Sequence, residues 1–207
     1  MSLRISGGYL QGRVLEAPSG NFYRPLTGRL KRSLFDYLGA ALQGASVLDL
    51  FAGVGSFGVE ALSRGAARVT FVEKERAAVE CLEANLRALG LEEAARVYAE
   101  DVFSYFDVTR PSKPYDIVFL DPPYGQGLAF RAVERLATWP GFGAGTVGLV
   151  KTFKKERFAG PEALALLEVR RVGDDNLSVF RRASSGGDIK APAEGDSASP
   201  WAETKDE

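Results

Sequence analysis

The stretch VLDLFAGVGSFG, residues 47–58, decides the fold class of this chain. It opens with an apolar run typical of a buried strand, and its glycines then follow the spacing G-x-G-x-x-G as a helical pattern begins near residue 56. Glycines at this spacing allow a tight turn and a close approach of the backbone to a ligand at the start of a helix. The stretch therefore predicts the first strand, loop and helix of an open α/β sheet.

Strands and helices continue to alternate through most of the chain. Candidate strands span residues 46–51, 68–73, 95–98, 115–121 and 146–151. Candidate helices span residues 56–64, 75–89 and 127–138. This alternation predicts a mostly parallel sheet with helices on both faces. Residues 168–172 and 177–182, joined by a turn, predict a terminal hairpin that adds an antiparallel strand.

The two ends of the chain differ from this central part. Residues 1–25 predict a small β attachment of short strands around glycine turns, and a helix is expected to lead from there to about Leu38. The main domain is expected to cover residues 26–183. Residues 184–207 are rich in Ser, Gly, Ala, Pro and acid, and carry six acids and two lysines, a net charge of −4. They are expected to form a disordered tail.

Composition limits the chemistry that this chain can perform. Its single cysteine, Cys81, cannot form an internal disulfide, and a chain without histidine has few ligands for zinc. Catalysis is therefore expected to need neither histidine nor a metal ion. No apolar run approaches the roughly 18 residues of a membrane span, and the first residues lack the apolar core of a signal peptide. We expect a cytoplasmic protein.

Acidic residues at the predicted strand ends favour one cofactor over another. Glu73 ends the second strand 20 residues after Gly53, which fits a dinucleotide site, so a nicotinamide dehydrogenase must be considered. Asp49 argues against it, because a carboxylate beside the glycine loop would repel a pyrophosphate. S-adenosylmethionine has no phosphate, and its sulfonium and amino groups are positive. Glu73 could then accept hydrogen bonds from the ribose, and Asp101 would lie near the adenine amino group.

These motifs together resemble a known family. The order D-x-F-x-G-x-G from Asp49, then Glu73, Asp101 and the D-P-P-Y motif from Asp121 is similar to that of S-adenosylmethionine-dependent amino-methyltransferases with a Rossmann-like (class I) fold. The stretches LRISGGYLQGRVLEAP, RPLTGRLKRSLFDYL, VLDLFAGVGSFGVEALSRGA and DIVFLDPPY resemble the RsmD family, which methylates a guanine N2 in small-subunit (16S) ribosomal RNA. Gly28 and Lys151 depart from the family pattern, which usually has Asp and Glu there, so neither is given a role.

The resemblance, which covers roughly residues 3–182, implies a cofactor site and an amine site. The residues expected to bind the cofactor are Asp49, Phe51, Ala52, Gly53, Gly55, Glu73, Lys74, Asp101 and Val102. The residues expected at the amine are Asp121, Pro122, Pro123 and Tyr124. Asp121 and the backbone carbonyl of Pro122 would accept hydrogen bonds from the amine, the prolines would fix that carbonyl, and Tyr124 would stack on the base. The simpler alternative is that the two prolines only end the strand.

A basic cluster near the start of the chain is the candidate RNA-binding surface. Residues 1–35 carry six basic residues and one acid, a net charge of +5. The basic residues are Arg4, Arg13, Arg24, Arg29, Lys31 and Arg32. The expected partner is small-subunit ribosomal RNA, either free or within the assembled subunit. Two alternatives stay open: a DNA adenine-N6 methyltransferase, because D-P-P-Y serves that amine equally well, and a non-catalytic RNA-binding assembly module.

Overall fold

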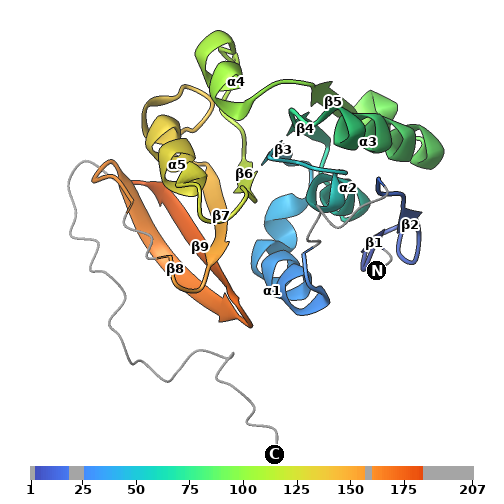
Figure 1. The fold of residues 1–207 in the computed structure, drawn as a ribbon, viewed down its shortest axis with the longest axis horizontal. Helices are drawn as coiled ribbons and strands as arrows, with labels where there is room; N and C mark the ends of the chain where they lie inside the picture. Colours follow the sequence, from blue (N-terminus) through green and yellow to red (C-terminus); the bar gives the residue numbers. More distant parts are fainter. Residues whose placement is uncertain (1–2, 19–25, 157–159, 184–207) are drawn as a thin grey trace, which may run out of the picture.

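The computed structural model describes residues 3–18, 26–156 and 160–183, and its centre is a seven-stranded sheet with the order β5-β4-β3-β6-β7-β9-β8 (Figure 1). The strands are β3 (Ser46–Leu50), β4 (Arg68–Val72), β5 (Ala95–Tyr98), β6 (Ile117–Leu120), β7 (Val147–Phe153), β8 (Leu164–Val172) and β9 (Asp175–Arg182). The first five pair in parallel, while β9 is antiparallel to both β7 and β8. The predicted parallel sheet with a terminal antiparallel hairpin is confirmed.

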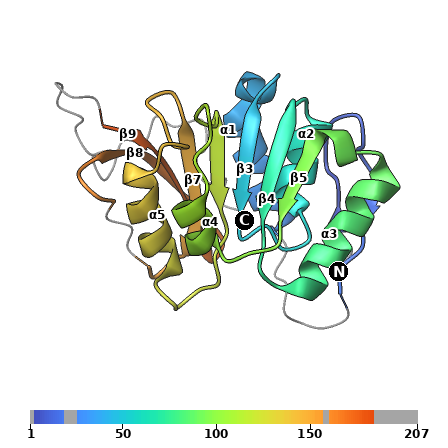
Figure 2. The same ribbon diagram turned by 90° about the horizontal axis from the view of Figure 1, so that it is seen from above.

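Helices cover both faces of this sheet (Figure 2). They are α1 (Gly28–Leu38), α2 (Ser56–Ser63), α3 (Arg76–Leu89), α4 (Val102–Val108) and α5 (Leu128–Thr138), with short 3-10 turns at Gly39–Leu42 and Glu92–Ala94. Successive residues of each central strand point to opposite faces. Val47 of β3 therefore belongs to the core that includes residues of α1, α2 and α3, whereas Leu48 belongs to the core that includes residues of α4 and α5. Burial on both faces explains why these strands are continuous apolar runs.

The N-terminal segment packs onto the main sheet domain. β1 (Leu3–Arg4) and β2 (Val14–Leu15) form a two-stranded antiparallel sheet, as predicted, and Leu3, Ile5 and Leu15 join the core under α1 and α2. Glu60 of α2 fixes this contact, because it accepts hydrogen bonds from the backbone N–H and hydroxyl of Ser6 at 2.9 and 2.7 Å. The β attachment is thus held by a buried carboxylate as well as by apolar packing.

Some elements differ from the sequence prediction. α4 was not predicted; it begins where Asp101 accepts a hydrogen bond from the Phe103 N–H at 2.9 Å. β8 begins at Leu164, four residues earlier than expected, because Leu164 and Ala165 are buried and a bulge between Leu166 and Glu168 lets the strand continue. The predicted tail, residues 184–207, lies outside the described residues. Among the described helices, none is long and apolar enough to cross a membrane.

Candidate functional site

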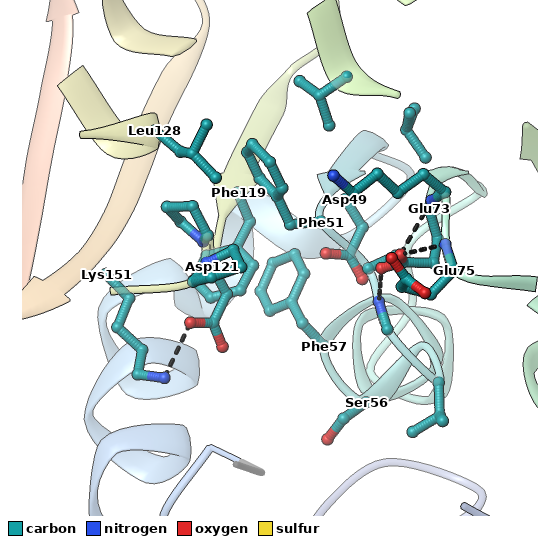
Figure 3. A pocket seen from close by; sticks show the side chains of 18 of the residues that line it. Asp49, Phe51, Ser56, Phe57, Glu73, Glu75, Phe119, Asp121, Leu128 and Lys151 are labelled. Carbon is teal, nitrogen blue, oxygen red and sulfur yellow. Dashed lines mark hydrogen bonds and ion pairs between the residues drawn. The ribbon is translucent and has the colours of Figure 1, made fainter. Parts of the chain in front are cut away.

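The site lies at the carboxyl ends of β3, β4 and β6, on either side of the point where the strand order reverses. Open α/β sheets bind ligands at such a point. A cavity of about 930 Å³ opens there (Figure 3). Of the residues predicted for the cofactor and the amine, the cavity is lined by Asp49, Phe51, Ala52, Gly53, Glu73, Lys74, Asp101, Val102, Asp121, Pro122, Pro123 and Tyr124. One pocket therefore brings together two residue sets, one within residues 49–102 and the other at residues 121–124.

The glycine loop between β3 and α2 has a left-handed backbone. Gly53 has φ 55° and Gly55 has φ 82°, and Gly55 serves as the N-cap of α2. Gly55 does not line the cavity, unlike the other predicted cofactor residues; a Cβ there would come within 2.4 Å of Leu82. Phe51 is also left-handed, with φ 59°, although it is not a glycine. Such strain costs about 1 to 3 kcal/mol and is concentrated at functional sites.

Asp49 is the most enclosed acid of the site. It is 2% exposed and accepts a hydrogen bond from the Gly58 N–H at 3.0 Å. Burial raises the pKa of Asp49 well above its ordinary value, and the nearby charges of Asp121 and Glu73 raise it further. A cationic ligand would lower the pKa of Asp49, because it favours the ionised carboxylate.

Glu73 connects the end of β4 to the glycine loop. Its Oε2 accepts a hydrogen bond from the Gly53 N–H at 2.7 Å, and its Oε1 accepts from the backbone N–H groups of Lys74 and Glu75, both at 2.8 Å (Figure 3). Each carboxylate oxygen can accept two hydrogen bonds, so Oε2 keeps a free acceptor position toward the cavity. One hydroxyl of a ribose could donate a hydrogen bond to it.

Asp101 and Lys74 lie at the same rim as Glu73. Asp101 caps α4, and its Oδ2 is 3.8 Å from Nζ of Lys74. Val102, the first residue of α4, is buried and forms part of the cavity wall. The aromatic floor was not predicted: the rings of Phe57 and Phe119 stack with centroids 4.1 Å apart and line the cavity. Phe57 lies in the glycine motif and Phe119 in the strand before D-P-P-Y, so both belong to motifs that are recognisable in the sequence.

The D-P-P-Y end of β6 is held by residues of β7 and β9. Nζ of Lys151 is 2.8 Å from Oδ1 of Asp121 (Figure 3). The Tyr124 hydroxyl donates a hydrogen bond to Oδ1 of Asp175, and the Tyr124 ring centroid is 5.1 Å from Lys151 Nζ. Lys151 was set aside because it departs from the family pattern, and Asp175 was missed because the sequence shows neither the strand pairing nor the side-chain direction there. The only signal was a lysine at the end of an otherwise apolar strand.

The predicted RNA-binding residues do not all reach the surface. Arg4, Arg13, Arg29 and Arg32 are exposed, and Arg24 lies outside the described residues. Lys31 is 5% exposed, and its Nζ contacts Glu60 Oε2 at 3.1 Å and the Arg4 carbonyl at 3.1 Å. The sequence analysis placed Lys31 in the candidate RNA-binding cluster, but in the structure the buried Glu60 carboxylate draws its ammonium inward. Lys31 is therefore left out of the proposed RNA contacts.

Comparison with known proteins gives the family. Residues 3–181 match the family described as Conserved hypothetical protein 95. The chain belongs to this family, the RsmD family. It is 39% identical over 134 residues to Ribosomal RNA small subunit methyltransferase D of Escherichia coli strain K12. The aligned region covers 65% of this chain and 66% of the relative, so the chain spans just under two thirds of that relative's length. It is 33% identical over 172 residues to the protein of the same name from Haemophilus influenzae, covering 83% and 89%.

Two solved structures share the fold of this chain. The structure described as "Putative methyltransferase yhhF" from Escherichia coli superposes with a TM-score of 0.78 at 30% identity, covering 88% of this chain and 98% of that one. The structure described as "putative methylase HI0767" from Haemophilus influenzae superposes with a TM-score of 0.75 at 30% identity, covering 89% of this chain and 100% of that one. The sheet with its terminal hairpin is thus the methyltransferase Rossmann-like fold. Among the described residues, no group of three or more Cys, His, Asp or Glu side chains could hold a metal ion.

Proposed function

We propose that this chain transfers a methyl group from S-adenosylmethionine to the exocyclic N2 amine of a guanine in small-subunit ribosomal RNA. One observation carries the proposal: a single cavity holds the buried acids Asp49 and Glu73 on one side and the Asp121-Pro-Pro-Tyr end of β6 on the other. The first pair suits a cationic nucleoside, and the second suits a planar amine.

The cofactor part of the proposal rests on charge. Asp49 and Glu73 are both buried, at 2% and 8% exposed, and burial together with the nearby charge of Glu73 raises the pKa of Asp49. A pyrophosphate would add negative charge to this site, whereas a sulfonium and an ammonium group would compensate it. S-adenosylmethionine supplies an electrophilic methyl group when bound. Glu73 would hold the ribose, and Asp101, Val102 and Lys74 would surround the adenine.

The amine part of the proposal rests on the geometry at the end of β6. The lone pair of a base amine is delocalised into the ring, so the site must favour a pyramidal nitrogen. Asp121 and the Pro122 carbonyl would accept one N–H each, and Oδ2 of Asp121 remains available because Lys151 contacts Oδ1. The fixed φ of the two prolines would hold the carbonyl in place. Tyr124 would support the base from the side of β9.

The RNA part of the proposal rests on the relatives and on the exposed arginines. The named relatives are small-subunit ribosomal RNA methyltransferases. Arg29 and Arg32 are exposed on α1, and Leu26, just before that helix, lines the cavity. Leu3, beside the exposed Arg4, also lines the cavity. Exposed guanidinium groups on these two segments could bind RNA phosphates while one base enters the site.

Label transfer tests the proposed function directly. The protein is incubated with methyl-labelled S-adenosylmethionine and, separately, with free small-subunit ribosomal RNA, assembled small subunits and double-stranded DNA. We expect label in ribosomal RNA or subunits, recovered as N2-methylguanosine after digestion. Label in DNA as N6-methyladenine would replace this function with the adenine alternative. RNA binding without any label transfer would support a non-catalytic assembly module.

A further inference from the structure

Lys151 is a buried cation beside the amine site. It is 4% exposed and lies in β7, next to the strand that ends in Asp121. The β6–β7 register pairs Leu120 with Val150, so Asp121, which follows β6, comes next to Lys151 of β7. Their side chains meet with Nζ 2.8 Å from Oδ1. Lysine is rarely buried unless it is paired, so this contact is a specific feature of the site.

Lys151 is the cation among the charged groups that the structure places around Asp121. Asp49 of β3 and Asp175 of β9 add negative charge, and Tyr124 places its ring near Lys151 and its hydroxyl on Asp175. Burial raises the pKa of Asp121, Asp175 raises it further, and Lys151 opposes both through its charge and its hydrogen bond. Lys151 therefore opposes protonation of Asp121.

We propose that Lys151 is a positioning residue that keeps Asp121 ionised and occupies its Oδ1, so that Oδ2 faces the target amine as a hydrogen-bond acceptor. The inference rests on the proposed amine methylation. A direct contact between Lys151 and the base is a poorer explanation, because so little of the lysine side chain is exposed. Lys151 acts through Asp121.

The charge state of Asp121 matters for the reaction. The amine nitrogen forms a bond to the methyl carbon as the sulfur–methyl bond breaks, the sulfonium becomes a neutral thioether, and the extra proton on nitrogen passes to water. A carboxylate accepts an N–H and stabilises the positive charge that develops on nitrogen. A protonated Asp121 would instead present a hydroxyl donor to the lone pair and oppose the attack. Loss of the Lys151 charge should therefore slow the chemical step at neutral pH.

A pH profile separates this role from a structural one. Single-turnover methylation is measured at saturating cofactor and RNA for the parent, Lys151→Met and Lys151→Arg. The matched control is Lys154→Met, because Lys154 pairs with Asp174 near the same strand end but away from Asp121. We expect Lys151→Met to move the acid limb of the profile to higher pH by about one to three units, with the rate recovering at alkaline pH. In Lys151→Arg and in Lys154→Met, the acid limb of the profile should lie at the same pH as in the parent. Calorimetric cofactor affinity should change only a few-fold.

Two results would overturn the inference: a Lys151→Met profile that coincides with the parent, or one lowered equally at every pH. An inactive parent would reject the proposed function instead, and a carbon-13 NMR titration of the Asp121 carboxyl in the parent and in Lys151→Met would then test the charge coupling without turnover. If Lys151→Met does not fold, the same titration in the parent decides. The carboxyl is expected to be ionised at neutral pH, and a protonated one would contradict the role given to Lys151.

Discussion

The backbone N–H of Gly53 donates a 2.7 Å hydrogen bond to Oε2 of Glu73. This contact joins the glycine loop after β3 to the end of β4, two segments that are 20 residues apart. Glu73 is thus already ordered for a ligand by three backbone N–H groups. The conformational entropy lost when a ribose binds is therefore small, because the carboxylate is already held in one position.

Replacement of Glu73 should weaken cofactor binding more than chemistry. Glu73→Ala removes a charged acceptor worth about 1.5 to 3 kcal/mol and releases the Gly53 N–H. We expect a large loss of S-adenosylmethionine affinity by calorimetry, and a methylation rate that excess cofactor partly restores. Glu75→Ala is the control, because Glu75 lines the same cavity while its side chain does not hold the glycine loop. Equal affinities of Glu73→Ala and the parent would contradict the ribose role.

Cofactor affinity should rise with pH. The pKa of Asp49 is raised by burial and by its acidic neighbours in the free protein, so Asp49 holds a proton to higher pH than an ordinary aspartate. A bound cation favours the carboxylate and lowers that pKa, so binding releases a proton. Affinity should therefore increase as pH rises toward the raised pKa and level off above it.

Calorimetry in buffers of different ionisation enthalpy measures this proton release. Asp49→Asn is the matched variant, because it keeps the shape of the side chain but cannot ionise; its affinity should be low and independent of pH. NAD should not compete with S-adenosylmethionine at any pH. A parent affinity that stays constant across the acid range would show that Asp49 does not face the cation.

The exposed arginines should set the salt dependence of RNA binding. Arg4, Arg13, Arg29 and Arg32 are exposed, and each phosphate contact contributes about 0.7 to 0.9 to the slope of log affinity against log salt. The quadruple alanine variant should bind ribosomal RNA more weakly and with a flatter slope, measured by fluorescence anisotropy at several salt concentrations. If the variant showed the same salt slope as the parent, the RNA-binding surface would lie elsewhere.

Lys31 should contribute to stability and leave that slope unchanged. Nζ of Lys31 contacts the Glu60 carboxylate. Burial raises the pKa of Glu60, but hydrogen bonds from Ser6 and the charge of Lys31 lower it more, so this pKa lies below its ordinary value. Arg64 still contacts Oε1 of Glu60 at 2.9 Å when Lys31 is lost, so Lys31→Met removes one charged hydrogen bond and should lower the free energy of unfolding by about 1.5 to 3 kcal/mol. Exposed Lys113 is the control, and Lys113→Met should change the free energy of unfolding by less than about 0.5 kcal/mol. A stable Lys31→Met protein with a flattened salt slope would return Lys31 to the RNA surface.

The sequence predicted those parts of the site that follow from local patterns. The acids and the D-P-P-Y motif follow apolar runs, and parallel strands bring their carboxyl ends to one edge, so Asp49, Glu73 and Asp121 had to lie near each other. Lys31 was misplaced because its partner Glu60 is distant in sequence and belongs to another helix. The Lys151 contact was missed for the same reason, since strand register is not encoded locally.

The helix α4 was missed for a different physical reason. Its seven residues, VFSYFDV, are mostly aromatic and β-branched, a composition typical of strands. The Asp101 cap starts the helix, and tertiary packing holds it, with the rings of Tyr105 and Phe106 buried and 5.7 and 5.1 Å from the Trp139 ring. Packing of this kind overrides local propensity in short helices.

The most direct test of the account is the single-turnover rate of Asp121→Ala on small-subunit ribosomal RNA, measured together with its cofactor affinity. Asp121 is proposed to contact the amine and not the cofactor, so its loss should act mainly on the transition state. The account predicts a rate lower by about a hundredfold or more, near 2.7 kcal/mol by analogy with the loss of one preorganised electrostatic group, with cofactor affinity within a few-fold of the parent. Methylation at the parent rate, or a loss of cofactor affinity in step with activity, would contradict the assignment of Asp121 as the residue that holds the amine.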